Sequence, residues 1–159
     1  MWDMTAGPDQ SCGYHENAHT WDTVALALGV PLIAIDLPGQ GHSSRRTDRD
    51  YGPWRNAEAV AAVVRDAAPR ATAVIGMSLG GVTAIRLAAG WPDLVRKLVV
   101  VDVTPQVSNQ GMSKADRGAV ALIDGPPPDA RVEVVAGSGH AVQSDQPLEF
   151  ARLVSEFLG

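Results

Sequence analysis

A serine with glycines on both sides occupies the middle of the chain, in the stretch Gly76-Met77-Ser78-Leu79-Gly80-Gly81. The apolar run Ala73-Val74-Ile75 precedes it, and a helical pattern begins at Val82. A serine on such a strand-to-helix turn is held above the carboxyl edge of a sheet, where ligands bind. The first amides of the helix, including that of Leu79, point toward a developing oxyanion. The pattern predicts Ser78 as the nucleophile of a hydrolase and Leu79 as an oxyanion donor.

A serine hydroxyl needs a neighbouring base, which is most often a histidine. His140 follows the expected strand at 132–135 behind the small residues of 136–139, so we expect it at the same edge of the sheet. His42 also follows an apolar run, but six loop residues separate them. We therefore interpret His140 as the base.

The elements that must position these residues alternate between strand and helix along the chain. Apolar runs of strand length and helical spacing of apolar residues predict strands over 30–35, 71–75, 98–101 and 132–136, and helices over 20–28, 56–68, 82–89 and 147–158. Asn56 is the expected N-cap of the second helix. Such alternation is typical of an α/β fold with a mostly parallel sheet. We expect one domain over 1–159, with four to five strands and with residues 1–18 as loop.

Three motifs in order carry a resemblance to a known family: Asp36-Leu-Pro-Gly-Gln-Gly-His-Ser43, the 76–81 stretch, and Gly137-Ser-Gly-His140. They strongly resemble the α/β-hydrolase superfamily, and most of all its cap-bearing esterase and carbon–carbon hydrolase branch. The likeness covers 17–107 and 129–158. It implies an α/β-hydrolase-like sheet with helices on both faces. It also implies Ser78 as nucleophile, His140 as base, Leu79 as oxyanion donor, a small-molecule ester as substrate, and no cofactor or metal.

The chain departs from the family pattern before its first helix. The family has a His-Gly-rich oxyanion loop after a strand, whereas here the equivalent stretch is 11–17, with no apolar strand before it. Gly13 is the remaining candidate for the second oxyanion donor. The short stretch between Ser78 and His140 leaves little room for a cap domain. We therefore expect a reduced form of the fold.

The chain also departs from the family pattern in the position of the acid that orients the histidine. The run 120–123 ends in Asp124 and imitates the strand before the family's acid, but a parallel crossover needs about a dozen residues. Only a few residues separate Pro128 from the next strand at Val132. Asp102, directly after the strand over 98–101, is our candidate acid, since some family members carry theirs there. The alternative is a turn aspartate, which leaves the acid absent.

Two other functions remain open on the sequence. One is a catalytically weak or inactive hydrolase remnant that acts by binding. The other is a zinc metallopeptidase, because His15-Glu16-Asn17-Ala18-His19 matches H-E-x-x-H. Against zinc, Gly13-Tyr14 and Asn17 make a poor helix interior, and no third ligand follows in a helix.

The charge and composition of the chain limit the kinds of partner and location that we expect. The net charge of −5 and the scattered basic residues, with one loop cluster at Arg45, Arg46 and Arg49, argue against nucleic acid. We see no transmembrane-length apolar run and no secretory signal, and a single cysteine excludes an intrachain disulfide. We therefore expect a cytoplasmic protein that does not bind membranes. Exposed strand edges in a shortened sheet favour self-association.

Overall fold

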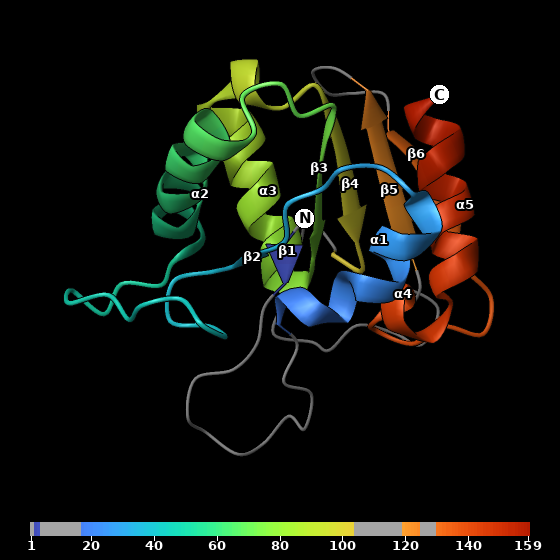
Figure 1. The fold of residues 1–159 in the computed structure, drawn as a ribbon, viewed down its shortest axis with the longest axis horizontal. Helices are drawn as coiled ribbons and strands as arrows, with labels where there is room; N and C mark the ends of the chain where they lie inside the picture. The colour runs from blue at the N-terminus through green and yellow to red at the C-terminus, as the bar shows by residue number, and fades with distance from the viewer. Residues whose placement is uncertain (1, 4–16, 104–118, 125–129) are drawn as a thin grey trace.

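The computed structural model describes residues 2–3, 17–103, 119–124 and 130–159. Within these ranges, helices flank a six-stranded sheet of order β2-β1-β3-β4-β5-β6 (Figure 1). The strands are β1 (Trp2–Asp3), β2 (Ile35–Asp36), β3 (Ala73–Met77), β4 (Lys97–Val101), β5 (Ala119–Asp124) and β6 (Ala130–Val134). The helices are the short 3-10 turns η1 (Ala18–Trp21) and η2 (Pro92–Leu94), together with α1 (Asp22–Leu28), α2 (Pro53–Ala67), α3 (Ser78–Gly90), α4 (Val142–Asp145) and α5 (Pro147–Leu158).

Strand direction divides the sheet into two parts. The pairs β1–β2, β1–β3 and β3–β4 are parallel, whereas β5 is antiparallel to both β4 and β6. The expected α/β class with a mostly parallel sheet is thus confirmed, with six strands where we expected four to five. The run 120–123 is a strand but not a parallel neighbour of the last one, as its short connection requires.

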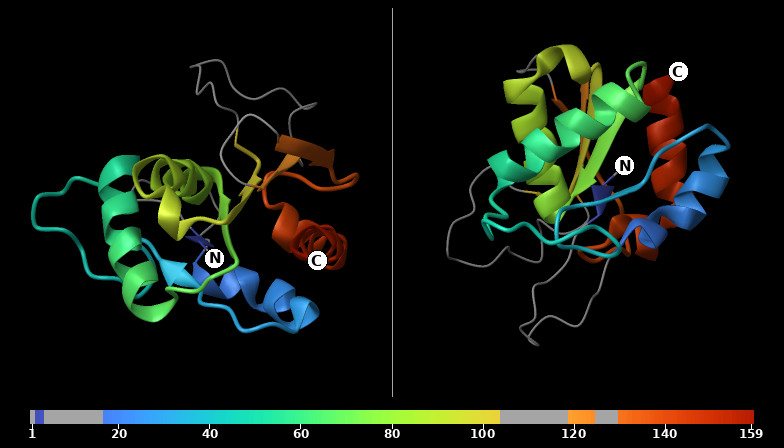
Figure 2. Two further views of the ribbon diagram at one scale, coloured as in Figure 1. Left: turned by 90° about the horizontal axis from the view of Figure 1, so that it is seen from above. Right: turned by 60° about the vertical axis from the view of Figure 1, so that its left-hand side comes forward.

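Helices pack on both faces of the sheet, with α1 and α5 on one side and α2 and α3 on the other (Figure 2). Side chains alternate along β3 and β4 between two cores. Ile75, Met77, Val99 and Val101 join the core of α1 and α5, while Val74, Leu98 and Val100 join that of α2 and α3. Burial on both sides explains why these strands are continuous apolar runs. No helix in the described ranges is long and apolar enough to cross a membrane.

Several sequence-based boundaries need correction. Of the strand expected over 30–35, only Ile35 is in a strand, and Pro31 could not donate to a ladder. The helix expected from Asn56 begins at Pro53, with Gly52 as N-cap; Asn56 is buried and donates from Nδ2 to the carbonyl of Tyr51. Proline suits this position because the first helical amide has no partner.

The N-terminal segment also differs from the expected loop over 1–18. Trp2–Asp3 forms β1, which lies between β2 and β3, and Ala18 begins η1. An isolated two-residue strand has no periodicity to detect, and only its pairing partners define it. The rest of 1–16 lies outside the described residues. Helix α5 was expected over 147–158 and is confirmed over that range.

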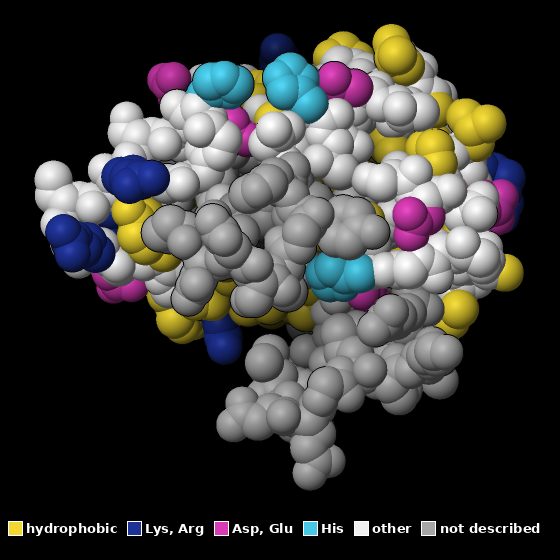
Figure 3. Space-filling view, turned by 90° about the horizontal axis from the view of Figure 1, so that it is seen from below, with side chains coloured by type: hydrophobic (Ala, Val, Ile, Leu, Met, Phe, Trp, Pro, Cys, Tyr) yellow, Lys and Arg dark blue, Asp and Glu magenta, His cyan; other side chains and the backbone are white. Residues whose placement is uncertain are grey.

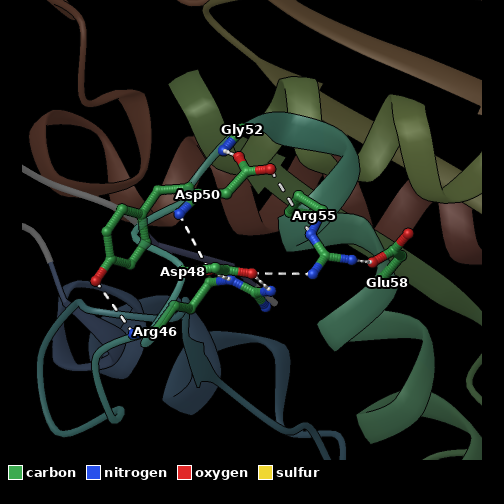
Figure 4. A network of polar contacts seen from close by, with 7 residues as sticks. Arg46, Asp48, Asp50, Gly52, Arg55 and Glu58 are labelled. Carbon is green, nitrogen blue, oxygen red and sulfur yellow. Dashed lines mark hydrogen bonds and ion pairs between the residues drawn. The ribbon is translucent and has the colours of Figure 1, made fainter.

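The loop between β2 and α2 contains the basic cluster, and acidic neighbours neutralise part of it (Figure 4). Arg46 Nε and Nη2 donate to Asp48 at 2.9 and 2.6 Å, and Arg55 Nη2 donates to the same carboxylate at 3.0 Å. The hydrogen bond from Arg46, with further ones from the Asp50 amide and Arg55, holds the pKa of the Asp48 carboxyl well below its usual value. Arg46 is therefore paired with an acidic residue of its own loop.

The interior of α5 provides a test of which residues stabilise the fold. Phe150 is fully buried and packs against Trp21 at 6.0 Å between ring centroids, so Phe150→Ala should lower the free energy of unfolding by about 3–5 kcal/mol. Leu148 lies on the same helix but is 71% exposed, so Leu148→Ala is the control and should change it by less than about 0.5 kcal/mol. Urea unfolding monitored by circular dichroism measures both. Equal losses in the two variants would contradict this packing.

Candidate active site

Ser78 is the first residue of α3 and directly follows β3. Its φ is +50°, a left-handed conformation that costs a residue with a Cβ about 1–2 kcal/mol. Gly76 makes the sharp turn feasible, because a Cβ there would lie 2.4 Å from the carbonyl oxygen of Gly80 and 2.8 Å from the amide of Gly81. The strand-to-helix turn expected from the sequence is thus present, with a strained serine at its tip.

Asp102 occupies the matching position on the neighbouring strand. Met77 pairs with Val101 in the parallel register of β3 and β4, so Ser78 and Asp102 leave the sheet side by side. Asp102 also has a φ of +50°. Backbone strain in non-glycine residues concentrates at functional sites, where the surrounding structure must hold it.

His140 reaches the same edge from the loop after β6, as expected. Its Nδ1 contacts Oδ2 of Asp102. The Asp102 side chain is 1% exposed and that of His140 50% exposed, so the pair joins a buried carboxylate to an imidazole that solvent can reach. Oδ1 of Asp102 is buried and has no hydrogen-bond partner in the described part of the chain. The imidazole is therefore the partner that this carboxylate depends on.

The loop that holds His140 is fastened by its own polar groups. Ser138 Oγ donates to the carbonyl of Val135 at 2.6 Å, and the amide of Gly139 donates to Asp145 Oδ2 at 2.7 Å. Gly137 has a φ of +76°, which allows the chain to reverse after β6. These hydrogen bonds restrain the backbone of the loop, which places the His140 imidazole at the end of the sheet.

This arrangement suits proton transfer from a hydroxyl. A carboxylate that accepts from Nδ1 leaves Nε2 as the basic nitrogen and stabilises the imidazolium that forms. Leu79 lies in the first turn of α3, whose N-cap Met77 makes no side-chain capping hydrogen bond. Amides in the first turn of a helix lack intrahelical partners and favour anions. Gly13, the other expected oxyanion donor, lies outside the described residues.

Asp36 accepts hydrogen bonds that hold the neighbouring loop in place. The sequence did not predict this role. Its carboxylate accepts from the amides of Ala18 and His42, both at 2.9 Å, and its carbonyl accepts from Ser43 Oγ at 2.7 Å. A Cβ at Gly41 would collide with this carboxylate at 2.1 Å. The turn-rich stretch after Asp36 is the signal for this role. It ties the end of β2 to the start of η1.

His42 does not take the place of His140 as the base. Its side chain is 90% exposed, and its Nδ1 lies 3.8 Å from Asp36 Oδ2. Asp36 makes two amide hydrogen bonds, which identifies it as an anchor for the loop. Figure 3 shows the face at the carboxyl ends of β3 and β4, on which histidine side chains lie at the surface.

The structure does not support the zinc motif. Asn17 is the N-cap of η1 and accepts from the amide of His19 at 3.0 Å, so the third residue of H-E-x-x-H has an extended backbone and not a helical one. His19 Nδ1 is 3.1 Å from Asp22 Oδ2, and both side chains are largely exposed. His15 and Glu16 lie outside the described residues. Within the described ranges, no group of three or more histidine, cysteine or acidic residues could hold a metal ion.

The family model for the alpha/beta hydrolase fold matches residues 12–124, which is more than half of the chain. This chain belongs to the α/β-hydrolase fold family. The resemblance to the α/β-hydrolase superfamily that the sequence predicted is therefore confirmed.

Two curated relatives are esterases. The chain is 55% identical over 115 residues to esterase Rv0045c of Mycobacterium tuberculosis (strain ATCC 25618 / H37Rv), which covers 71% of this chain and 39% of that protein. It is 32% identical over 165 aligned residues to the pimeloyl-[acyl-carrier protein] methyl ester esterase of Sodalis glossinidius, covering 100% of this chain and 55% of that protein. The chain thus spans between about two fifths and just over half of these relatives.

Solved structures agree on the fold. A predicted CIB-like hydrolase from Thermoplasma acidophilum matches with a TM-score of 0.70 and 25% identity, over 92% of this chain and 82% of that one. The crystal structure of the esterase Rv0045c from Mycobacterium tuberculosis matches with a TM-score of 0.54 and 63% identity, over 56% of this chain and 32% of that one.

The strain at Ser78 can be measured with two variants that both lack the hydroxyl. Ser78→Gly should be more stable than Ser78→Ala by about 1 kcal/mol, since glycine adopts a φ of +50° without the Cβ clash. Urea unfolding of the two proteins measures the difference. An alanine variant as stable as the glycine variant would show that the turn relaxes and holds no strain.

Proposed function

We propose that this protein is a serine hydrolase that cleaves carboxylic esters through an acyl-enzyme on Ser78. His140 removes the proton of the Ser78 hydroxyl, the oxygen attacks the acyl carbon, and the alcohol leaves with the proton from His140. A water molecule, deprotonated by the same histidine, then attacks the acyl-enzyme. The acid is released and the Ser78 hydroxyl is restored.

The contact between Asp102 and His140 is the observation that carries this proposal. Asp102 is buried, strained and next to Ser78 in the strand register, yet its partner is a histidine from a loop 38 positions further along the chain. In the proposed mechanism, Asp102 is a positioning residue. It keeps Nε2 of His140 as the base and offsets the charge of the imidazolium.

The oxyanion would be held by the amide of Leu79, with Gly13 as the proposed second donor. Preorganised donors of this kind stabilise the tetrahedral intermediate, and the loss of one typically costs about 10²–10³ in turnover. The proposal requires no cofactor and no metal. A cytoplasmic location is part of it, in keeping with a single cysteine.

Small soluble esters are the proposed substrate class. One relative is named as a methyl ester esterase and another as an esterase, which supports a carboxylic ester as the reacting group. The half-exposed His140 side chain supports substrates that approach from solvent. Methyl esters and p-nitrophenyl acetate are suitable first compounds.

A binding protein with a weak or inactive site is the second candidate. The observation in its favour is the 50% exposure of the His140 side chain. Water that reaches the base also reaches charged intermediates, which weakens their electrostatic stabilisation.

A fluorophosphonate probe distinguishes the two functions. We expect covalent labelling at Ser78, located by peptide mass spectrometry, and no labelling of Ser78→Ala. His140→Ala should slow labelling by roughly 10²–10⁴-fold because the base is lost. His42→Ala is the matched control and should label at the wild-type rate. The His42 side chain is 90% exposed, and its backbone amide, which donates to Asp36, remains in the variant. Folded wild-type protein that takes no label at Ser78 would contradict the hydrolase and favour the second candidate.

The role of Asp102 needs its own measurement. Asp102→Asn keeps the shape of the side chain but removes the charge that offsets the imidazolium, so p-nitrophenyl acetate turnover should fall by at least tenfold. KM should change little, because Asp102 acts through His140. Unchanged kcat would show that Asp102 serves only as a turn residue.

A further inference from the structure

Strand β6 is an edge strand with an unused side. It pairs antiparallel with β5 over five residue pairs, from Ala119↔Val134 to Ile123↔Ala130, and within the described ranges no strand pairs on its other side. The strand at the opposite end of the sheet, β2, has only two residues. The free backbone groups of an edge strand are a template for pairing with another strand. Of these two edge strands, β6 is long enough to specify the register of pairing with another strand.

One face of β6 carries exposed valines. Val132 pairs with Ala121, which pairs with Val100, so all three lie on the sheet face that α2 and α3 cover elsewhere. Val132 is 60% exposed and Val134 is 65% exposed. Figures 1 and 2 show why: β5 and β6 lie at the α5 end of the sheet, away from α2. This apolar side of the strand has no helix over it in the described part of the chain.

The other face of β6 carries one charge of each sign. Glu133 pairs with Val120, a member of the core of α1 and α5, so Glu133 and Arg131 are on that face. Arg131 Nε donates to Glu133 Oε1 at 2.6 Å, and the two side chains are 58% and 36% exposed. Charged residues on an edge strand discourage most partners. They favour a partner that presents the same two charges in reverse order.

A second copy of β6 is such a partner. Two copies of β6 can pair antiparallel around a two-fold axis perpendicular to the sheet, which keeps the same face of both strands on the same side. Residues directly opposite each other must then lie on the same face, so the axis passes between one residue and its own copy. An axis at Arg131 or at Glu133 sets like charges directly opposite each other, which is destabilising. An axis at Val132 sets each Arg131 opposite the Glu133 of the other copy. The two valines at position 132 then face each other on the apolar side.

We propose that this chain forms a symmetric dimer through antiparallel pairing of β6, with the two-fold axis at Val132. The charges select the register, and the exposed valines gain a contact on the apolar face. The surface is independent of the Ser78 site, because it requires neither the nucleophile nor the base.

Charge reversal tests this dimer with full-length variants. Sedimentation equilibrium over a range of protein concentrations should give a dimer for wild type. Arg131→Glu or Glu133→Arg places like charges across the axis twice, so each should weaken dimerisation roughly tenfold or more. The double variant restores complementarity and should dimerise like wild type. Arg45→Glu is the matched control, an exposed loop residue with the same charge change and no expected effect.

Mixing the two single variants gives the sharpest result. A chain with two acids at these positions and a chain with two arginines are complementary, so their equimolar mixture should form a heterodimer although each alone is weakened. Circular dichroism confirms that every variant is folded. A wild-type protein that stays monomeric at high concentration overturns the proposal. A dimer that Arg131→Glu and Glu133→Arg both leave intact also overturns it. So does the failure of both the double variant and the mixture to associate.

Discussion

The register of β3 against β4 is the constraint on which the rest of the site depends. Because Met77 pairs with Val101, the next residue of each strand leaves the sheet at the same height, and these residues are Ser78 and Asp102. Both adopt a φ of +50°, a conformation that isolated chains avoid. Apolar strands buried on both faces hold the two ends in place. Hydrophobic burial of the sheet thus maintains local strain at its edge.

The antiparallel strand β5 explains how His140 reaches that edge. A strand parallel to β5 would need a crossover of about a dozen residues, but only residues 125–129 separate β5 from β6. Here β5 runs back along β4, and β6 then runs back along β5, so β6 is parallel to β4 again. The loop after β6 therefore starts at the same edge as Asp102. The two antiparallel pairings thus bring the end of β6, and with it the imidazole, to the carboxylate.

Other contacts join segments that are far apart in sequence. Lys97 Nζ, at the start of β4, donates to the carbonyl of Phe157 at 2.7 Å and packs over the Phe157 ring at 4.9 Å. A cation at the C-terminus of α5 is favourable because the last carbonyls of a helix lack partners. Asp36 similarly joins the end of β2 to η1. These contacts fasten the elements that meet around the sheet ends.

The sequence by itself determined the α/β class, the strand-to-helix turn at Ser78, and the position of His140 after the last strand. Continuous apolar runs and a G-x-S-x-G pattern are local signals, and α5 shows how reliable a strongly periodic helix is. The same reasoning expected a strand over 30–35, where only Ile35 pairs, and a helix start at Asn56, which is instead buried within α2. Strand pairing and burial are not local, so these details could not be read from the residues concerned.

Only the tertiary structure brought the acid and the histidine together. The short connection before Val132 and the family resemblance favoured Asp102 over Asp124, but neither could show a contact between Asp102 and His140. The direction of β5 puts Asp124 opposite Lys97, at the amino end of β4, and leaves Asp102 at the carboxyl end beside His140. The left-handed conformation of Asp102 and the two-residue strand β1 were equally hidden. Each exists only because neighbouring strands hold it in place.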